Sequence, residues 1–241
     1  VEKPILWSLE NPYLYKMITS IIQNNEIVDT YQTTFGIRTI RFDANEGFFL
    51  NGKHVKIKGS NNHQDHAGVG AAIPDALQEY RLKILKSFGS NAYRCAHNPP
   101  TPELLDVCDR LGILVIDENR LMGITKTHLD DVKKLIERDR NHPSIISWSI
   151  GNEEWGIEND EVGARIATTM QAYVKSLDET RPATAAFSGG IGSNGITTVM
   201  DLLGINYIAN KSTDKQHKLF PNQVIWGTEE GSTNATRGEY Y

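Results

Sequence analysis

Two apolar segments of this chain end in pairs of glutamates. Residues 145–154 read IISWSIGNEE, and residues 224–230 read VIWGTEE. Burying a carboxylate without a partner is costly, so acids at the end of a buried strand usually have an ionic or chemical role. Because the pattern occurs twice, it predicts two carboxylates that face a common pocket.

A pair of carboxylates on opposite sides of a pocket is suited to the hydrolysis of a glycosidic bond. One carboxylic acid protonates the departing oxygen, and the other carboxylate attacks or stabilises the sugar cation. A separation of roughly 5 Å indicates retention of configuration, whereas roughly 6.5 to 9.5 Å leaves room for an inverting water. The sequence does not give this distance, so both stereochemical outcomes remain open.

Short apolar strands alternate with helical stretches from Gly47 onward, which predicts an α/β fold with a parallel sheet. The expected strands are 55–59, 91–95, 113–118, 145–151, 183–187, 202–207 and 223–228. The expected helices are 75–88, 101–111, 129–140 and 161–177. Since eight repeats close a TIM barrel, the seven strands predict a (β/α)8 TIM barrel that is either open or lacks its final strand.

Polar side chains follow six of these strands, at the end of the barrel that carries reacting groups. In strand order they are NNHQDH at 61–66, Arg94 with His97, Asp117 with Glu118, Asn152 with Glu153, Asn206 with Tyr207, and Glu229. The carboxyl ends of parallel strands meet at one mouth, so these groups are expected to share one pocket.

Residues 1–47 differ from the rest of the chain because they are rich in β-forming residues. Two runs, 14–22 and 27–35, flank a polar turn, which predicts an antiparallel hairpin. A hairpin of this size is too small to hold its own core.

The composition argues against several classes of function. The 241 residues carry a net charge of -5, and no cluster of Lys and Arg is present. Nucleic-acid binding needs such a cluster, so it is not expected. The sequence contains no run of about 18 apolar residues, so no membrane span is predicted. Cys95 and Cys108 lie in apolar surroundings, as buried free thiols do, and the compartment stays unknown.

Several motifs, in order along the chain, resemble glycoside hydrolase family 2, the β-galactosidase and β-glucuronidase family. They are FGIR at 35–38 with LNGK at 50–53, GSNNH at 59–63, NAYRCAHNP at 91–99, and WSIGNE at 148–153. The similarity runs over nearly the whole chain. It implies the carboxyl-terminal part of an immunoglobulin-like β-sandwich at residues 1–42. It also implies a TIM-barrel catalytic domain at residues 43–241, without the final strand.

The resemblance assigns roles to the glutamates. Glu153 matches the general acid/base of the family, and Glu229 matches its nucleophile. Glu154 and Glu230 are rivals for these roles, although both are more simply read as solvated or salt-bridged loop acids.

The resemblance also implies residues that contact the substrate or the nucleophile. Asn152 matches the amide that binds the sugar 2-hydroxyl, and Tyr207 matches a tyrosine beside the nucleophile. Arg94 matches an arginine that keeps the nucleophile ionised by its opposite charge. His63 and His97 match histidines that line the sugar pocket.

The remaining candidates are aromatic or amide side chains. Trp155 follows the predicted acid directly and is a candidate for stacking on a sugar face. Trp148 and Trp226 are expected to serve packing, and Trp7 is expected in the core at the edge of the sandwich. Asn206 has a purely structural interpretation, in which it ties down the end of a strand.

No metal site and no cofactor are predicted. The magnesium-dependent β-galactosidases carry an Asn-x-Glu-x-His-Gly motif after the third strand, whereas residues 117–123 read DENRLMG. An alternative hypothesis is a metal-dependent hydrolase that uses His63, Asp65 and His97, although tetrahedral sites need a defined set of three or four ligands.

The resemblance therefore implies a retaining exo-β-glycosidase that acts on terminal β-linked sugars, with β-galactosides as the leading substrates. The alternatives are a β-glucuronidase, another family 2 specificity, or a carbohydrate-binding fragment without catalysis. The expected partner is a carbohydrate, with no nucleic acid and no membrane. The oligomeric state stays open, a homo-oligomer included.

Overall fold

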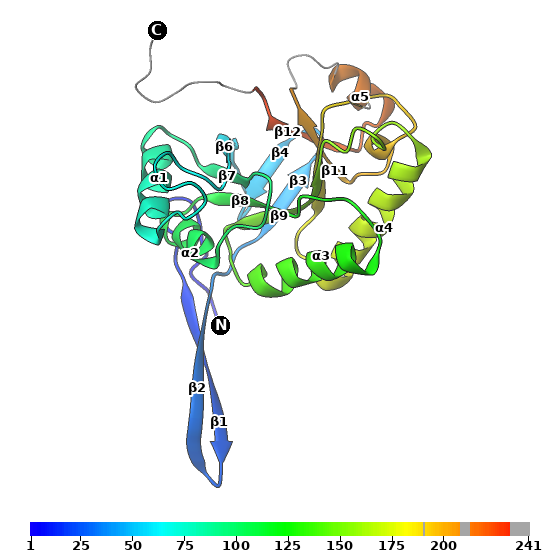
Figure 1. The fold of residues 1–241 in the computed structure, drawn as a ribbon. Coiled ribbons are helices and arrows are strands. Elements are labelled where there is room, and N and C mark those ends of the chain that lie inside the picture. The colour runs from blue at the N-terminus through cyan, green and yellow to red at the C-terminus, as the bar shows by residue number, and fades with distance from the viewer. Residues whose placement is uncertain (190, 208–212, 232–241) are drawn as a thin grey trace.

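Seven parallel strands form one sheet, in which each strand pairs with its neighbours along the chain (Figure 1). The computed structural model describes residues 1–189, 191–207 and 213–231. The strands are β6 (Gly59–Asn62), β7 (Ala92–Cys95), β8 (Leu114–Glu118), β9 (Ile145–Asn152), β10 (Ala183–Phe187), β11 (Leu202–Asn206) and β12 (Val224–Glu229). This single-wound parallel order is the topology of a TIM barrel, so the predicted incomplete barrel is confirmed.

Helices connect the strands and lie outside the sheet (Figure 1). They are α1 (Asp75–Ser87), α2 (Pro102–Leu111), α3 (Lys126–Asp139), α4 (Glu161–Leu177), α5 (Thr213–Leu219) and the 3-10 helix η1 (Ile196–Thr198). The predictions for α1, α2 and α4 are confirmed within one residue at each end. Helix α3 begins earlier than expected because Thr125 caps it and accepts a hydrogen bond from the His128 N–H. In the described ranges, no helix combines the length and apolarity needed to cross a bilayer.

The first barrel strand lies later in the chain than predicted. Residues 55–58 are outside the sheet, and β6 begins at Gly59. The Asn91 side chain holds this segment, since its Oδ1 accepts from the Lys58 N–H at 2.7 Å and its Nδ2 donates to Lys56 O at 3.0 Å. These side-chain hydrogen bonds take the place of a strand ladder, so the expected strand at 55–59 was wrong.

A glycine begins β6 because β7 approaches it closely. Gly59 pairs with Ala92, and a Cβ at this position would lie 2.6 Å from Ala92 O. Any side chain would therefore push β6 away from β7. The close approach fixes the register that places Asn61 beside Arg94.

The amino-terminal hairpin is confirmed and projects as a ribbon away from the barrel (Figure 1). It comprises β1 (Tyr15–Gln23) and β2 (Glu26–Phe35), and the Tyr15 and Phe35 rings stack at its base with centroids 5.6 Å apart. Large apolar side chains on the ribbon are exposed, Ile18 and Tyr31 among them. The assignment of residues 1–42 to an immunoglobulin-like sandwich stays a prediction.

A small antiparallel sheet packs at the amino-terminal end of the barrel. It comprises β3 (Ile40–Asp43), β4 (Gly47–Leu50) and β5 (Lys53–His54). Phe48 is buried in one cluster with Trp7, Leu114 and Ile146, the last two of which lie near the starts of β8 and β9. Trp7 also donates from Nε1 to Asp109 O at 2.9 Å. Trp7 is fully buried, so its expected core position is confirmed, and the cluster around it includes residues of the barrel strands.

A cavity of ≈ 680 Å³ lies inside the sheet, and side chains from β6, β7, β8 and β12 line it. β6 and β12 are the edge strands of the sheet. The cavity therefore reaches the gap between the first and last strands. Arg94 and Glu229 belong to its lining, which joins it to the polar mouth.

Strand β8 directs two neighbouring acids to opposite faces, because side chains alternate along a strand. Glu118 lies on the inner face, and Asp117 is fully buried on the outer face against α3. Neither oxygen of Asp117 has a hydrogen-bond partner among the described groups. Burial and the neighbouring Asp139 carboxylate raise the pKa of Asp117 well above its usual range. The protonated form of Asp117 is therefore favoured beside Asp139, which accepts from Arg138.

The Asp117→Asn variant is expected to lose a pH dependence of stability. An unfolded aspartate ionises at about pH 3.9, whereas the folded Asp117 keeps its proton, so unfolding above that pH releases a proton. The stability of the parent therefore falls as the pH rises toward the folded pKa of Asp117. Asparagine has nearly the same size and shape and does not titrate. Thermal unfolding between about pH 5 and pH 8 should show a flatter profile for the variant.

The exposed Asp131→Asn change on α3 serves as the control for this measurement, because it makes the same carboxyl-to-amide replacement at a solvated position. Its profile should run parallel to that of the parent. An Asp117→Asn profile that also runs parallel to the parent would contradict the buried proton.

Candidate active site

Glu153 and Glu229 approach each other at the carboxyl ends of β9 and β12. Asn206, the last residue of β11, places its Nδ2 2.8 Å from Glu153 Oε1 and 3.4 Å from Glu229 Oε2. The two carboxylate oxygens therefore lie no farther apart than the sum of 2.8 and 3.4 Å. This limit, which applies to one pair of oxygens, is compatible with the roughly 5 to 5.5 Å between the carboxyl groups of retaining glycosidases.

Glu229 receives donors from three residues. Tyr207 donates its hydroxyl to Glu229 Oε1 at 2.8 Å. Arg94 Nη1 and Asn206 Nδ2 each lie 3.4 Å from Glu229 Oε2. These contacts fix the orientation of the carboxylate, as a nucleophile requires.

The chain turns sharply at Glu153 and Tyr207, directly after β9 and β11. Both residues have positive φ, 49° for Glu153 and 57° for Tyr207. Residues other than glycine rarely adopt this conformation, and it is enriched at functional sites. Neighbouring strands hold both turns, because Glu153 N–H donates to Ala186 O at 2.9 Å and Tyr207 N–H donates to Glu229 O at 2.5 Å.

The amide of Asn152 is fixed by two donors. Its Oδ1 accepts from Arg94 Nη2 at 2.7 Å and from Asn206 Nδ2 at 3.2 Å. The Nδ2 group of Asn152 is thereby turned away from both donors. Asn206 in turn accepts from Thr228 at 2.8 Å, which settles its own orientation. Asn206 thus contacts both glutamates, and the interpretation that it only ties down a strand end was wrong.

Arg94 is buried at the end of β7 and bonds to four other residues. Its Nε and Nη2 donate to Glu118 Oε2 at 2.8 and 2.7 Å, and Nη2 also reaches Asn152. Its Nη1 reaches Thr228 O at 3.3 Å and Glu229 at 3.4 Å. Arg94 therefore joins two carboxylates from different strands.

Glu118 is a central residue of this network; the sequence analysis placed it at the barrel mouth but assigned it no role. It is fully buried and accepts from Arg94, from the Ser149 hydroxyl at 3.0 Å and from His97 Nδ1 at 2.8 Å. Two features of the sequence point to Glu118. It lies at the carboxyl end of an expected barrel strand, and side chains alternate along a strand, so Glu118 and its neighbour Asp117 face opposite sides of the sheet. These features do not reveal which donors would surround it.

His63 and His97 lie together beside this network. Their rings meet edge to face, with centroids 5.1 Å apart. His63 also lines the cavity with Arg94 and Glu229. The structure thus brings the predicted glutamates, Asn152, Arg94, Tyr207 and both histidines to one mouth.

Two family models match this chain. The model described as "Glycosyl hydrolases family 2, TIM barrel domain" matches residues 43–223, and the one described as "Glycosyl hydrolases family 2" matches residues 1–38. The chain belongs to glycoside hydrolase family 2. The resemblance of the sequence motifs to this family is thereby confirmed.

Relatives within family 2 cover the whole chain. The chain is 37% identical to the β-galactosidase BoGH2A of Bacteroides ovatus, covering 100% of this chain and 33% of the relative. It is 38% identical to a putative β-glucuronidase of Formosa agariphila, covering 100% of this chain and 23% of the relative. A crystal structure of a family 2 member from Bacteroides cellulosilyticus superposes with a TM-score of 0.86 at 39% identity, covering 93% of this chain and 31% of that one. The chain thus spans a third or less of these proteins.

The rival glutamates of this family 2 chain lie outside the shared network. Glu154 Oε1 lies 3.6 Å from Arg120 Nη1 and accepts from the Met122 N–H at 3.4 Å. Glu230 is exposed at the end of β12. Both therefore have the loop positions expected of solvated or salt-bridged acids.

The tryptophans divide into rim and packing residues. Trp155 is 73% exposed and donates from Nε1 to the Ser188 hydroxyl at 2.9 Å. Its role as a stacking platform stays a prediction. Trp148 is buried and donates to Asp178 at 2.9 Å, while Trp226 packs edge to face on Phe42. The packing roles predicted for Trp148 and Trp226 fit these contacts.

The alternative metal site at His63, Asp65 and His97 is contradicted by the geometry. In the described part of the chain, the group with ligand atoms close enough to share an ion is Asp106, Asp109 and His142. The nitrogen His97 Nδ1 is already engaged by Glu118.

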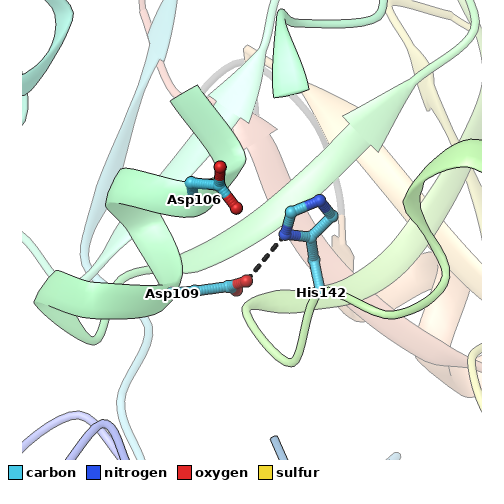
Figure 2. Close-up of side chains that lie close together, drawn as sticks. All are labelled: Asp106, Asp109 and His142. Carbon is cyan, nitrogen blue, oxygen red and sulfur yellow. Dashed lines mark hydrogen bonds and ion pairs between the residues drawn. The ribbon is translucent and has the colours of Figure 1, made fainter. Parts of the chain in front are cut away.

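The group of Asp106, Asp109 and His142 joins α2 to the loop before β9 (Figure 2). Asp109 Oδ2 lies 2.6 Å from His142 Nδ1, and Asp109 Oδ1 accepts from the Ser144 N–H at 3.0 Å. Burial opposes the charged form of His142, but the hydrogen bond and charge of Asp109 outweigh it and raise the pKa of His142. The protein itself thus satisfies both Asp109 oxygens. The cluster lies at the amino-terminal end of β9, far along that strand from Glu153, and its contacts are structural.

Proposed function

We propose that the complete protein is a retaining exo-β-glycosidase that hydrolyses terminal β-galactosides. The observation that carries the proposal is the single amide of Asn206 within hydrogen-bond reach of both Glu153 and Glu229. Two carboxylates held by one amide are suited to nucleophilic attack by one of them and proton transfer by the other.

In the proposed mechanism, Glu229 attacks the anomeric carbon and forms a covalent bond to the sugar. Glu153 protonates the glycosidic oxygen as the bond to the aglycone breaks. In the second step, Glu153 takes a proton from a water molecule, which attacks the anomeric carbon and releases Glu229. Two displacements on the same carbon restore the original β configuration.

The surrounding side chains support the two steps. Tyr207 and Arg94 orient Glu229 through the hydrogen bond and the ion contact already described. Asn152 presents its Nδ2 to the 2-hydroxyl, because Arg94 and Asn206 hold its Oδ1. His63, His97 and Trp155 bind the sugar at the rim.

A neutral sugar suits the described cavity better than a uronic acid. A glucuronide carboxylate needs an uncommitted cation, and Arg94 is the only lysine or arginine among the cavity-lining residues that the structure describes. All three of its nitrogens already have partners in the protein. A β-glucuronidase activity is the second candidate, because the relative from Formosa agariphila is named a putative β-glucuronidase.

The expected result for the full-length enzyme is release of the β-anomer of galactose before mutarotation. Proton NMR of the first minutes of hydrolysis measures the anomer directly, and initial appearance of the α-anomer would contradict the proposed mechanism. A parallel panel of nitrophenyl β-glycosides decides the sugar. If a β-glucuronide is cleaved faster than a β-galactoside, the proposed activity becomes that of a β-glucuronidase, and the proposed mechanism is unchanged.

A further inference from the structure

Glu118 shares Arg94 with the proposed nucleophile. Both carboxylates approach the same guanidinium, Glu118 from β8 and Glu229 from β12. Arg94 donates twice to Glu118, at 2.8 and 2.7 Å, whereas its contact with Glu229 is 3.4 Å long. The arginine is therefore committed first to Glu118.

The environment of Glu118 makes this commitment strong. Glu118 is fully buried, and Arg94 is 3% exposed. A buried carboxylate is stabilised only by its partners, and charge-assisted pairs with arginine are the strongest of these. Ser149 and His97 supply the other donors to Glu118. With these contacts Glu118 holds the guanidinium beside β8.

Without its contact with Glu118, Arg94 would have one carboxylate partner, Glu229. A guanidinium released from Glu118 would move toward Glu229 and form a close pair, because its charge would need compensation in a buried site. A close bidentate pair would occupy the lone pairs with which Glu229 attacks the sugar. It would also favour the ionised form of Glu229 more strongly than the present contact does.

We infer that Glu118 is a positioning residue that withholds Arg94 from Glu229 and so keeps the nucleophile reactive. This inference rests on the proposed function of Glu229. Glu118 also accepts from His97 Nδ1, which fixes the tautomer and leaves Nε2 to face the sugar. Both effects pass through other residues, since Glu118 itself lies beneath the pocket.

The charged and titratable groups around Glu229 are known from the described contacts. Arg94 approaches from β7, Tyr207 follows β11, and Glu153 follows β9. His63 lies across the cavity, and Glu118 acts from β8 through Arg94. Replacement of Glu118 by glutamine removes one negative charge from this set of groups. It also weakens the hydrogen-bonded ion pair between residue 118 and Arg94.

The test is the pH profile of kcat/KM for the Glu118→Gln variant of the full-length enzyme on an aryl β-galactoside. The acid limb is expected to move to lower pH by on the order of one unit, because both the lost charge and the released arginine favour ionised Glu229. We expect kcat to fall about 10-fold as the nucleophile becomes less basic, with KM near that of the parent. An acid limb that stays in place or moves to higher pH would overturn the inference.

Asp117→Asn is the matched control, since it makes the same chemical change one residue earlier on the same strand. Asp117 faces α3 and not the pocket, so its replacement should alter stability without moving the acid limb. Equal shifts in both variants would indicate a general effect of strand β8 and would also overturn the inference.

Ser149→Ala tests the inference even if Glu118→Gln does not fold. It removes one donor from Glu118 but keeps the charge, so Glu118 should hold Arg94 more tightly. The acid limb is then expected to move slightly to higher pH, and no movement would count against the inference. An active Glu229→Ala variant would instead defeat the proposed nucleophile, so the two failures are distinguishable.

Discussion

Replacement of Glu229 by alanine is expected to reduce kcat of the full-length enzyme by roughly 10⁴-fold or more, the scale seen when a nucleophile is removed. Without this carboxylate, no covalent bond to the anomeric carbon forms. The donors of Tyr207, Arg94 and Asn206 would remain around an empty position. Steady-state hydrolysis of an aryl β-galactoside measures the loss.

Glu230→Ala is the matched control for this variant. Glu230 is the next residue along the chain and is exposed, so its removal should leave kcat near that of the parent. Turnover retained in Glu229→Ala and lost in Glu230→Ala would reverse the assignment within the pair.

Replacement of Glu153 by glutamine is expected to make the rate depend strongly on the leaving group. Glutamine cannot supply a proton, so substrates with a basic alkoxide leaving group should lose about 10²- to 10⁴-fold in kcat/KM. Nitrophenyl glycosides need little protonation and should lose far less. The second step also slows because the base for water is absent, so the glycosyl-enzyme should accumulate and lower KM.

The measurement is kcat/KM across a series of aryl galactosides of graded leaving-group acidity. Glu154→Gln is the control, since Glu154 contacts Arg120 and the Met122 N–H and not the shared network. If kcat/KM of the Glu153→Gln variant falls by the same factor on every substrate, Glu153 is not the general acid.

The local features of the fold could be predicted because their causes are local in sequence. Proline at the start of α2 and Gly112 at its end bracket the helix, and Gly112 adopts φ 66° as expected of a helix-ending glycine. The first barrel strand could not be predicted correctly, because the side chain of Asn91, more than 30 residues away, binds the backbone of the segment at 55–58. The apolar pattern there reports burial on the barrel floor and not membership of the sheet.

The residues of the candidate site also fall into two groups, those found from the sequence and those whose role depends on distant contacts. Motifs in the chain located Glu153, Glu229, Asn152, Arg94 and Tyr207, because each lies at the end of an apolar strand or inside a family motif. Glu118 and Asn206 also end strands, but their importance depends on contacts with distant elements. Asn206 bonds to residues from β9 and β12, and Glu118 bonds to residues from β7 and β9.

The sequence by itself determined the order of strands and helices, the membership of glycoside hydrolase family 2, and the positions of the two glutamates, Glu153 directly after β9 and Glu229 at the end of β12. Only the tertiary structure decided how close these glutamates lie and which carboxylate holds Arg94. The physical reason is that hydrophobic patterning and turn residues act over a few positions along the chain. The distances between charges in the pocket depend instead on how the strands close around it, and therefore on all their packing contacts together.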